Sequence, residues 1–156
     1  MEAMITYYGH DTRRINHALK VHAFATLIAS REVQDERTRE IISYTAILHD
    51  IGIHEAERKY NSTAGNYQQI EGPPIARKIL SELDAPADIV NRVCFITGNH
   101  HSYNKIDGID FQIIVEADFL VNIDEDKMEQ EAVESVLQKV FRTEMGKNLV
   151  KGIYLN

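Results

Sequence analysis

The chain has 156 residues, of which 44% are hydrophobic, and a formal net charge of -7. This length suits one domain with a single buried core, and the acidic balance argues against a non-specific nucleic-acid or membrane surface. A single cysteine, Cys94, excludes an internal disulfide and is typical of a reducing compartment. Because the sequence also shows neither an apolar N-terminal segment nor a long hydrophobic span, we expect a cytoplasmic protein with no membrane and no nucleic-acid polymer as partner.

Apolar residues recur at helical spacing along most of the chain, whereas strand alternation is nowhere convincing. The pattern predicts an all-α fold of about six helices that forms one compact domain over residues 1–156. Asp11 and Asp35 are expected N-caps, and Pro73-Pro74 and Pro86 are expected helix starts. The predicted helices span residues 11–31, 35–51, 65–83, 87–101, 110–123 and 127–145.

Four polar side chains stand where the helical pattern calls for a hydrophobe. The first of them, His17, shares its stripe with Val21 and Ile28, four and eleven residues later. A polar group in a core costs roughly 2–7 kcal/mol unless a partner satisfies it, and one shared metal ion would satisfy imidazoles and carboxylates together. The four residues are His17, His49, Asp50 and Asp118.

Each of these residues, taken alone, also has a structural explanation. A buried histidine can be satisfied within a core, and Asp118 could form a buried salt bridge or cap a helix. A second His-Asp doublet, His10-Asp11, is explained by the capping role of Asp11. The order and spacing of the four residues distinguish them from such accidents.

The doublet stands in the string AILHDIG (residues 46–52), and the last aspartate ends the string EAD (residues 116–118). The first histidine lies in the string RINHALKV (residues 14–21). A middle helix is expected over the string GPPIARKIL (residues 72–80). Together these motifs resemble the HD superfamily of metal-dependent phosphohydrolases over about residues 10–125. The resemblance implies an HD-type helical domain in which His17, His49, Asp50 and Asp118 converge from several helices to bind a metal.

Two imidazoles and two carboxylates suit one divalent transition ion per chain, with an open position for water. These ligand types do not choose among manganese, iron, cobalt, nickel and zinc. A second ion is less expected. Two-metal members of the family resemble this chain in having a histidine near His100-His101, but they have another histidine where this chain has Gln68, and an amide oxygen is a poorer ligand. A weak second site, a phosphate contact and a core or supporting role therefore stay open for these residues.

A bound ion of this kind lowers the pKa of a coordinated water and draws charge from a phosphoryl oxygen, as a phosphohydrolase requires. Arg14 lies one turn before His17, and both this position and the resemblance make it a candidate phosphate contact. Lys105 and Arg58 are further candidates for substrate binding from neighbouring loops. Each of the three basic residues could instead form a surface salt bridge or be merely solvated.

Residues for acid–base chemistry are expected at and just after the doublet. Asp50, His54 and Glu55 could orient the water or protonate the leaving group. The competing interpretation of His54 is a solvated residue on a polar turn.

The ligand set and the resemblance together favour a metal-dependent phosphohydrolase, and the resemblance implies a nucleotide or a related small phosphorylated metabolite as its substrate. Two other classes stay open, a di-iron oxygenase of the HD type and a non-catalytic sensor that binds a nucleotide or a metal. The oxygenase requires a complete second site, which Gln68 disfavours. The helix over 127–145 could close the core or form a homodimer interface.

Overall fold

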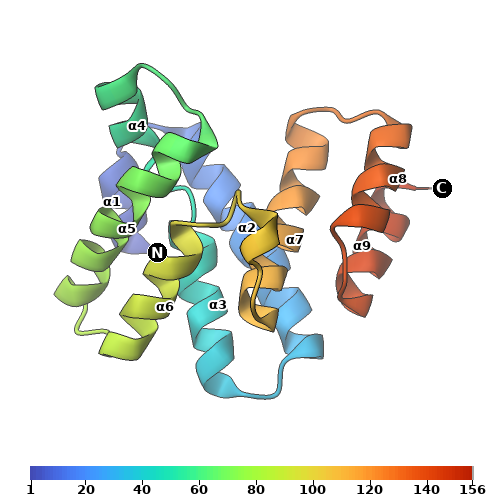
Figure 1. The fold of residues 1–156 in the computed structure, drawn as a ribbon, viewed down its shortest axis with the longest axis horizontal. Coiled ribbons are helices and arrows are strands. Elements are labelled where there is room, and N and C mark those ends of the chain that lie inside the picture. Colours follow the sequence, from blue (N-terminus) through green and yellow to red (C-terminus); the bar gives the residue numbers. More distant parts are fainter. Residues whose placement is uncertain (156) are drawn as a thin grey trace.

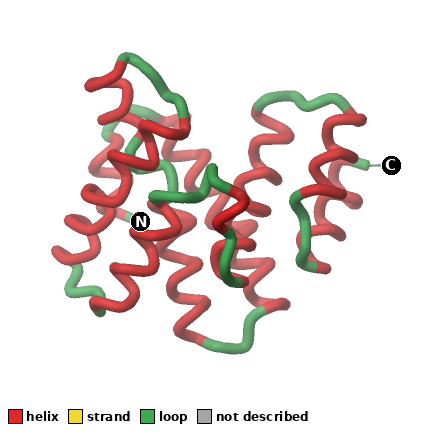
Figure 2. Tube along the Cα trace, in the orientation of Figure 1, coloured by secondary structure: helices red, strands yellow, loops and turns green. Residues whose placement is uncertain are grey.

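The computed structural model describes residues 1–155, so the expected domain end at residue 156 lies outside the described part. Within that part the chain forms nine α-helices, one short 3-10 helix and no strand, which confirms the all-α expectation (Figures 1 and 2). The helices are α1 (Glu2–Tyr8), α2 (Thr12–Glu32), α3 (Glu36–Leu48), α4 (Ile53–Tyr60), α5 (Gly65–Glu82), α6 (Ala87–Thr97), η1 (Tyr103–Lys105), α7 (Ile109–Glu125), α8 (Gln130–Lys139) and α9 (Glu144–Tyr154).

The expectation of about six helices was too low, because the additional elements are too short to show a periodic pattern. α1 buries only Met4 and Tyr8, and α4 buries only Ala56. The expected helix over 127–145 was also wrong, since α8 covers only residues 130–139 of it and a further helix, α9, begins at residue 144. Such short helices form because they pack against the rest of the chain, and that packing is not visible in a local sequence pattern.

A buried carboxylate accounts for the break before α9. Glu116 in α7 is fully buried and accepts hydrogen bonds from the backbone N–H groups of Arg142 and Thr143, at 2.6 and 3.0 Å. The Thr143 hydroxyl also donates to Glu116 and accepts from the backbone of Gly146, which caps the new helix. Because N–H groups inside a continuous helix would already be bonded, the chain must leave the helix to supply these donors.

The ends of the longer helices are set by caps and by packing. Asp11 and Asp35 accept backbone hydrogen bonds at the starts of α2 and α3, and Pro86 is the N-cap of α6, as expected. Pro73-Pro74 instead lies inside α5, because the packing of α5 on α6 overrides the local preference of proline for a first turn. α3 and α6 end at residues 48 and 97, before the predicted ends at 51 and 101.

Two apolar clusters hold the helices together. One joins α2, α3 and α7 to the C-terminal helices and includes Phe111 and Leu120. The other joins α1, α2, α3, α5 and α6 and includes Ala18, Ile51 and Leu80. In Figure 1, α2, α3 and α7 lie between α1 and α4–α6 on one side and α8 and α9 on the other. Since α2 and α3 contribute to both clusters, side chains at their junction are fixed from two sides.

The C-terminal helices cover the first cluster. Val133 of α8, Phe141 of the break and Val150 of α9 are buried within it. These contacts place the C-terminal segment against the core, and its use as a homodimer interface stays a prediction. None of the helices between residues 1 and 155 has the length and apolarity required to cross a bilayer.

Candidate metal centre

The His-Asp doublet occupies a tight turn between α3 and α4. His49 directly follows the last residue of α3, and the residue is 1% exposed. The hydroxyl of Tyr8 donates to the backbone carbonyl of Asp50 at 2.9 Å and so ties the turn to α1. Gly52 presses the turn against α5, where an added Cβ would lie 2.5 Å from the backbone nitrogen of Gly72. The short turn therefore fixes the direction of both side chains.

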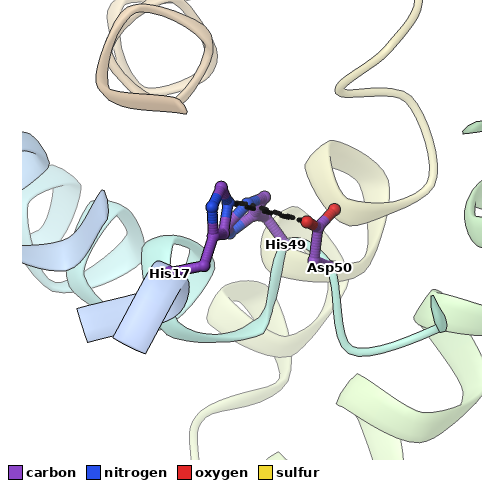
Figure 3. A group of neighbouring side chains, drawn as sticks. All are labelled: His17, His49 and Asp50. Atoms are coloured by element: carbon purple, nitrogen blue, oxygen red, sulfur yellow. Dashed lines mark hydrogen bonds and ion pairs between the residues drawn. The ribbon is translucent and has the colours of Figure 1, made fainter. Parts of the chain in front are cut away.

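His17 of α2 points at the same place from the neighbouring helix. Its Nε2 atom lies 3.3 Å from Nε2 of His49, and both atoms lie 3.6 Å from Oδ2 of Asp50. Figure 3 shows these three side chains turned toward one another. Asp118 joins them from α7, with Oδ1 at 3.2 Å from His17 Nε2 and 3.6 Å from His49 Nε2. The structure thus brings together the four residues that the sequence predicts as ligands.

The spacing of these atoms suits a shared ion. Ligand atoms bound about 2.0–2.2 Å from one ion, at tetrahedral or octahedral angles, lie roughly 2.8–3.6 Å apart. The measured separations, from 3.2 to 3.6 Å, fall in this range. Two imidazole nitrogens and two carboxylates are also a donor set that divalent transition ions accept. The residues present therefore fit a metal ion.

The outer nitrogen of each ring determines which nitrogen faces the centre. Nδ1 of His17 lies 3.0 Å from Oε2 of Glu125, and Nδ1 of His49 lies 2.9 Å from the carbonyl oxygen of Ala46. Both of these partners are acceptors, so each Nδ1 carries a hydrogen and donates it. In the neutral form of each ring, Nε2 is then left with its lone pair toward the centre, as a metal ligand requires.

Two supporting residues of this centre were missed from the sequence. Glu125 holds His17 and is itself paired with Lys20 at 2.5 Å, and Asn122 donates to Oδ1 of Asp118 at 3.0 Å. Asn122 and Glu125 lie one and two turns beyond Asp118 on α7, so they share its face of the helix. Their helical spacing from Asp118 was the sequence signal that could have identified them.

The charges of the cluster favour a cation. Burial opposes the ionisation of Asp50 and Asp118, but the neighbouring imidazoles outweigh it and hold the pKa of both carboxyls well below its usual range. Burial likewise opposes protonation of His49, yet the two carboxylates raise its pKa to about 9, and they raise the pKa of His17 as well. Two carboxylates that stay ionised in a buried site attract positive charge, which a proton or a metal ion can supply.

A second group of side chains shares Asp50 with the first. Nε2 of His100 lies 3.1 Å from Oδ1 of Asp50, and His101 completes a cluster whose ligand atoms lie within 4.8 Å of one another. Burial and the neighbouring His100 lower the pKa of His101 to about 4, so this ring stays neutral. Within residues 1–155, Nε2 of His101 and the side-chain oxygen of Gln68 are buried without a hydrogen-bond partner. This arrangement fits a second, weaker cation site.

No protein-family model matches the sequence, and no curated protein sequence matches it significantly. The structure is similar to the crystal structure of a predicted HD superfamily hydrolase from an uncultured Thermotogales bacterium, with a TM-score of 0.68. The aligned residues are 22% identical and cover 98% of this chain and 82% of the other. The chain has the HD-type fold. At this identity the likeness establishes the fold alone.

A cavity of about 190 Å³ opens beside the cluster of this HD-type fold. Its wall contains His17 and Asp50, so a molecule in the cavity would lie next to the candidate ligands. The remaining lining residues come from the start of α2, the segments around α4 and the end of α7. They are Arg13, Arg14, Ile53, Thr63, Asn122, Glu125 and Asp126.

Arg14 is in the wall of this cavity, but its guanidinium is already held. Nη1 lies 2.5 Å from Asp11, and Nη2 lies 2.7 Å from Glu57 of α4. Nε2 of His54 lies 2.9 Å from the same Asp11 carboxylate. The interpretation of His54 as a merely solvated residue is thus replaced by a contact that ties α4 to the start of α2.

The other predicted substrate-binding and acid–base residues lie elsewhere. Glu55 pairs with Arg58 at 2.5 Å and lines a separate cavity between α1 and α5. Arg58 is 67% exposed, and Lys105 donates to the side chain of Asn99 at 2.7 Å. None of the three lines the cavity beside the HD cluster. Their roles in substrate binding and acid–base chemistry stay predictions, and each of these charged side chains has a partner within a few residues or lies exposed.

Proposed function

We propose that the chain is a metal-dependent phosphohydrolase that releases phosphate from a small phosphorylated metabolite. The convergence of two imidazole nitrogens and two carboxylates beside a cavity carries the proposal. The HD-type neighbour, described as a predicted hydrolase, supports the same class of reaction. The proposed partner is a small phosphorylated substrate, and the cytoplasmic location stays a prediction.

In this proposal His17, His49, Asp50 and Asp118 hold one divalent transition ion. When bound, such an ion lowers the pKa of a coordinated water toward neutrality and draws charge from a phosphoryl oxygen. The other residues of the site contribute by orienting the metal ligands. Glu125 holds the ring of His17, Asn122 holds the carboxylate of Asp118, and the turn at Gly52 holds the doublet.

Arg14 and His54 have further roles in the proposal. Arg14 adds a fixed positive charge to the wall of the cavity, where a phosphate would be attracted. Its bonds to Asp11 and Glu57 keep the guanidinium in one orientation. Of the predicted proton donors, His54 contacts this network through Asp11, so it is the first to test as an acid for the leaving group.

A di-iron oxygenase is the second candidate, because Asp50, His100 and His101 form a second cluster beside the first. That function would require two irons per chain and a corresponding absorption band. A sensor without catalysis has weaker support, since it would not need all four residues of the first cluster. The phosphohydrolase is preferred because this chain has Gln68 where two-metal proteins of the HD type have a histidine, and an amide oxygen is a poorer ligand.

The direct experiment is phosphate release from a panel of phosphate monoesters with added manganese, for wild type and for His49→Gln. His10→Gln is the matched control, because His10 is an exposed histidine outside the cluster. We expect wild type and His10→Gln to release phosphate and His49→Gln to lose at least about a hundredfold in rate. Circular dichroism verifies that each variant is folded. Equal activity of folded His49→Gln and wild type would contradict the proposal.

A further inference from the structure

The cavity beside the metal cluster is small, and most of the residues that line it are polar. Its volume is about 190 Å³, and its only hydrophobic lining residue in the described chain is Ile53. Pockets for drug-sized ligands measure roughly 300–1,000 Å³ and have mostly apolar and aromatic walls. The cavity therefore has room for a phosphate and a few hydroxyl-bearing carbons, whereas a nucleobase would have to remain outside it.

No aromatic side chain of residues 1–155 lines the cavity to stack on a base. The tyrosines on neighbouring segments are engaged with other rings. Tyr103 contacts Phe119 with ring centroids 5.6 Å apart, and Tyr60 stacks on Tyr67 at 4.2 Å. Proteins that bind bases commonly stack them on aromatic rings, so the cavity lacks the usual means of recognising a nucleotide.

The polar groups of the wall differ in whether they are already bonded. Arg14 and Glu125 are each held by two partners. The side chains of Arg13 and Asp126 have no hydrogen bond or ion pair with any residue between 1 and 155. Arg13 can therefore bind phosphate oxygens, while Asp126 and the hydroxyl of Thr63 can bond hydroxyl groups.

We propose that the substrate is a phosphate monoester of a sugar or small polyol and not a nucleotide. Arg13 binds its phosphate, and Asp126 and Thr63 bind its hydroxyls. In the reaction the oxygen of water bonds to phosphorus, the ester P–O bond breaks, and the departing alcohol oxygen takes up a proton. The products are inorganic phosphate and the free polyol. This inference rests on the proposed phosphohydrolase function.

The first test compares kcat/KM for phosphate release from ribose 5-phosphate and glycerol 3-phosphate with that from adenosine 5′-monophosphate and its deoxy form, under manganese. We expect the better of the first pair to exceed both nucleotides by at least about tenfold. Equal or higher values for the nucleotides would overturn this inference and leave the phosphohydrolase function standing. Release from neither class would instead overturn the phosphohydrolase function and this inference with it.

The second test measures binding without turnover, by calorimetric titration with inorganic phosphate. Arg13→Gln should weaken phosphate binding about tenfold, because a charge-assisted hydrogen bond is lost. Arg31→Gln removes the same charge from the exposed end of α2 and should leave binding unchanged. An equal effect of the two variants, or none from Arg13→Gln, would contradict the assigned role of Arg13.

Asp126→Asn separates recognition of the polyol from recognition of phosphate. The variant should raise the KM for ribose 5-phosphate several-fold, with kcat changed less and with the affinity for inorganic phosphate unchanged. Asp124→Asn, at an exposed position two residues earlier in α7 and outside the cavity wall, is the control. A loss of phosphate affinity in Asp126→Asn, or an unchanged KM, would show that Asp126 does not bind the polyol.

Discussion

Each histidine of the cluster presents one ring nitrogen to the centre because its other nitrogen is engaged outside it. For His17 that outer partner is the carboxylate of Glu125, which Lys20 holds in turn. An outer partner of this kind fixes both the tautomer and the direction of the ring. The affinity for metal should therefore depend on a residue that does not itself touch the ion.

Glu125→Ala should lower metal affinity about 10- to 100-fold while the protein stays folded. The cause is the loss of the acceptor for Nδ1 of His17, which lies 3.0 Å away. Calorimetric titration with manganese measures the change. Glu131→Ala, at an exposed position of α8, is the control for removing one acidic side chain. Similar affinities of the two variants would show that Glu125 does not orient His17.

The carboxyl of Asp11 should make the stability of the fold depend on pH. Burial opposes its ionisation, but hydrogen bonds with His54 and Arg14 lower its pKa from 3.8 to about 2. A carboxyl with a lowered folded-state pKa stabilises the fold above its unfolded value, and this stabilisation is lost as the pH falls from 3.8 toward 2. At neutral pH the ionised carboxyl of Asp11 contributes about 1–2 kcal/mol to the free energy of unfolding, after solvent screening.

Asp11→Asn keeps a good N-cap but removes the charge. It should lower the free energy of unfolding by about 1–2 kcal/mol near neutral pH, and the difference from wild type should shrink below pH 4. Urea unfolding at a series of pH values measures the difference. A difference that is constant with pH would mean that the charge of Asp11 contributes nothing.

Among the elements, the turn between α3 and α4 determines the geometry of the doublet. Gly52 has an ordinary backbone conformation, so the glycine is required by a close approach and not by a strained φ. An added Cβ would meet backbone atoms of Gln68 and Gly72 at 2.6 and 2.5 Å. Backbone atoms cannot move aside as the end of a flexible side chain can.

Gly52→Ala should therefore lower the free energy of unfolding by about 2–3 kcal/mol and weaken metal binding, because α5 and the doublet must separate. Gly152→Ala is the matched control. Its Cβ meets nothing within 4 Å, and alanine is the better helix former, so stability should be unchanged or raised by up to about 1 kcal/mol. Urea unfolding of both variants compares them. Equal effects would contradict the close packing of this turn.

The elements also show what a local pattern can and cannot predict. The long helices followed from apolar periodicity and from the caps Asp11 and Asp35, because both signals lie within a few residues of each other. The break before α9 depends on Glu116, about 26 residues earlier in the chain, so no local pattern could reveal it. The prediction of a helix start at Pro73-Pro74 failed for the same reason, since the packing of α5 on α6 places these prolines inside α5.

For the whole molecule, the candidate ligands were predictable because a polar residue on an apolar stripe is conspicuous. His17 and Asp118 are 101 residues apart in sequence, yet each interrupts a stripe that the fold buries. Exposed charges give no such signal. Glu55 and Arg58 simply pair with each other, and Arg13 and Asp126 share a cavity wall only because α2 and α7 lie side by side.

Metal binding should stabilise the whole fold, because the ligands come from α2, α7 and the turn after α3. At a metal concentration 100-fold above Kd the gain is about 2.7 kcal/mol, which would raise Tm by about 5–10 °C. Thermal unfolding with manganese and then with a chelator measures the gain and its reversal. An unchanged Tm at saturating metal would mean that these ligands do not bind the ion together.

The most direct test of the central claim is the metal content of purified wild type and Asp118→Ala by elemental analysis, paired with phosphate release from the same samples. Asp118→Asn accompanies them, so that loss of the charge can be separated from loss of the side chain. We predict about one transition ion per wild-type chain, and the loss of both metal and phosphate release in folded Asp118→Ala. Wild-type protein that binds no metal from added manganese, iron or zinc would contradict the account.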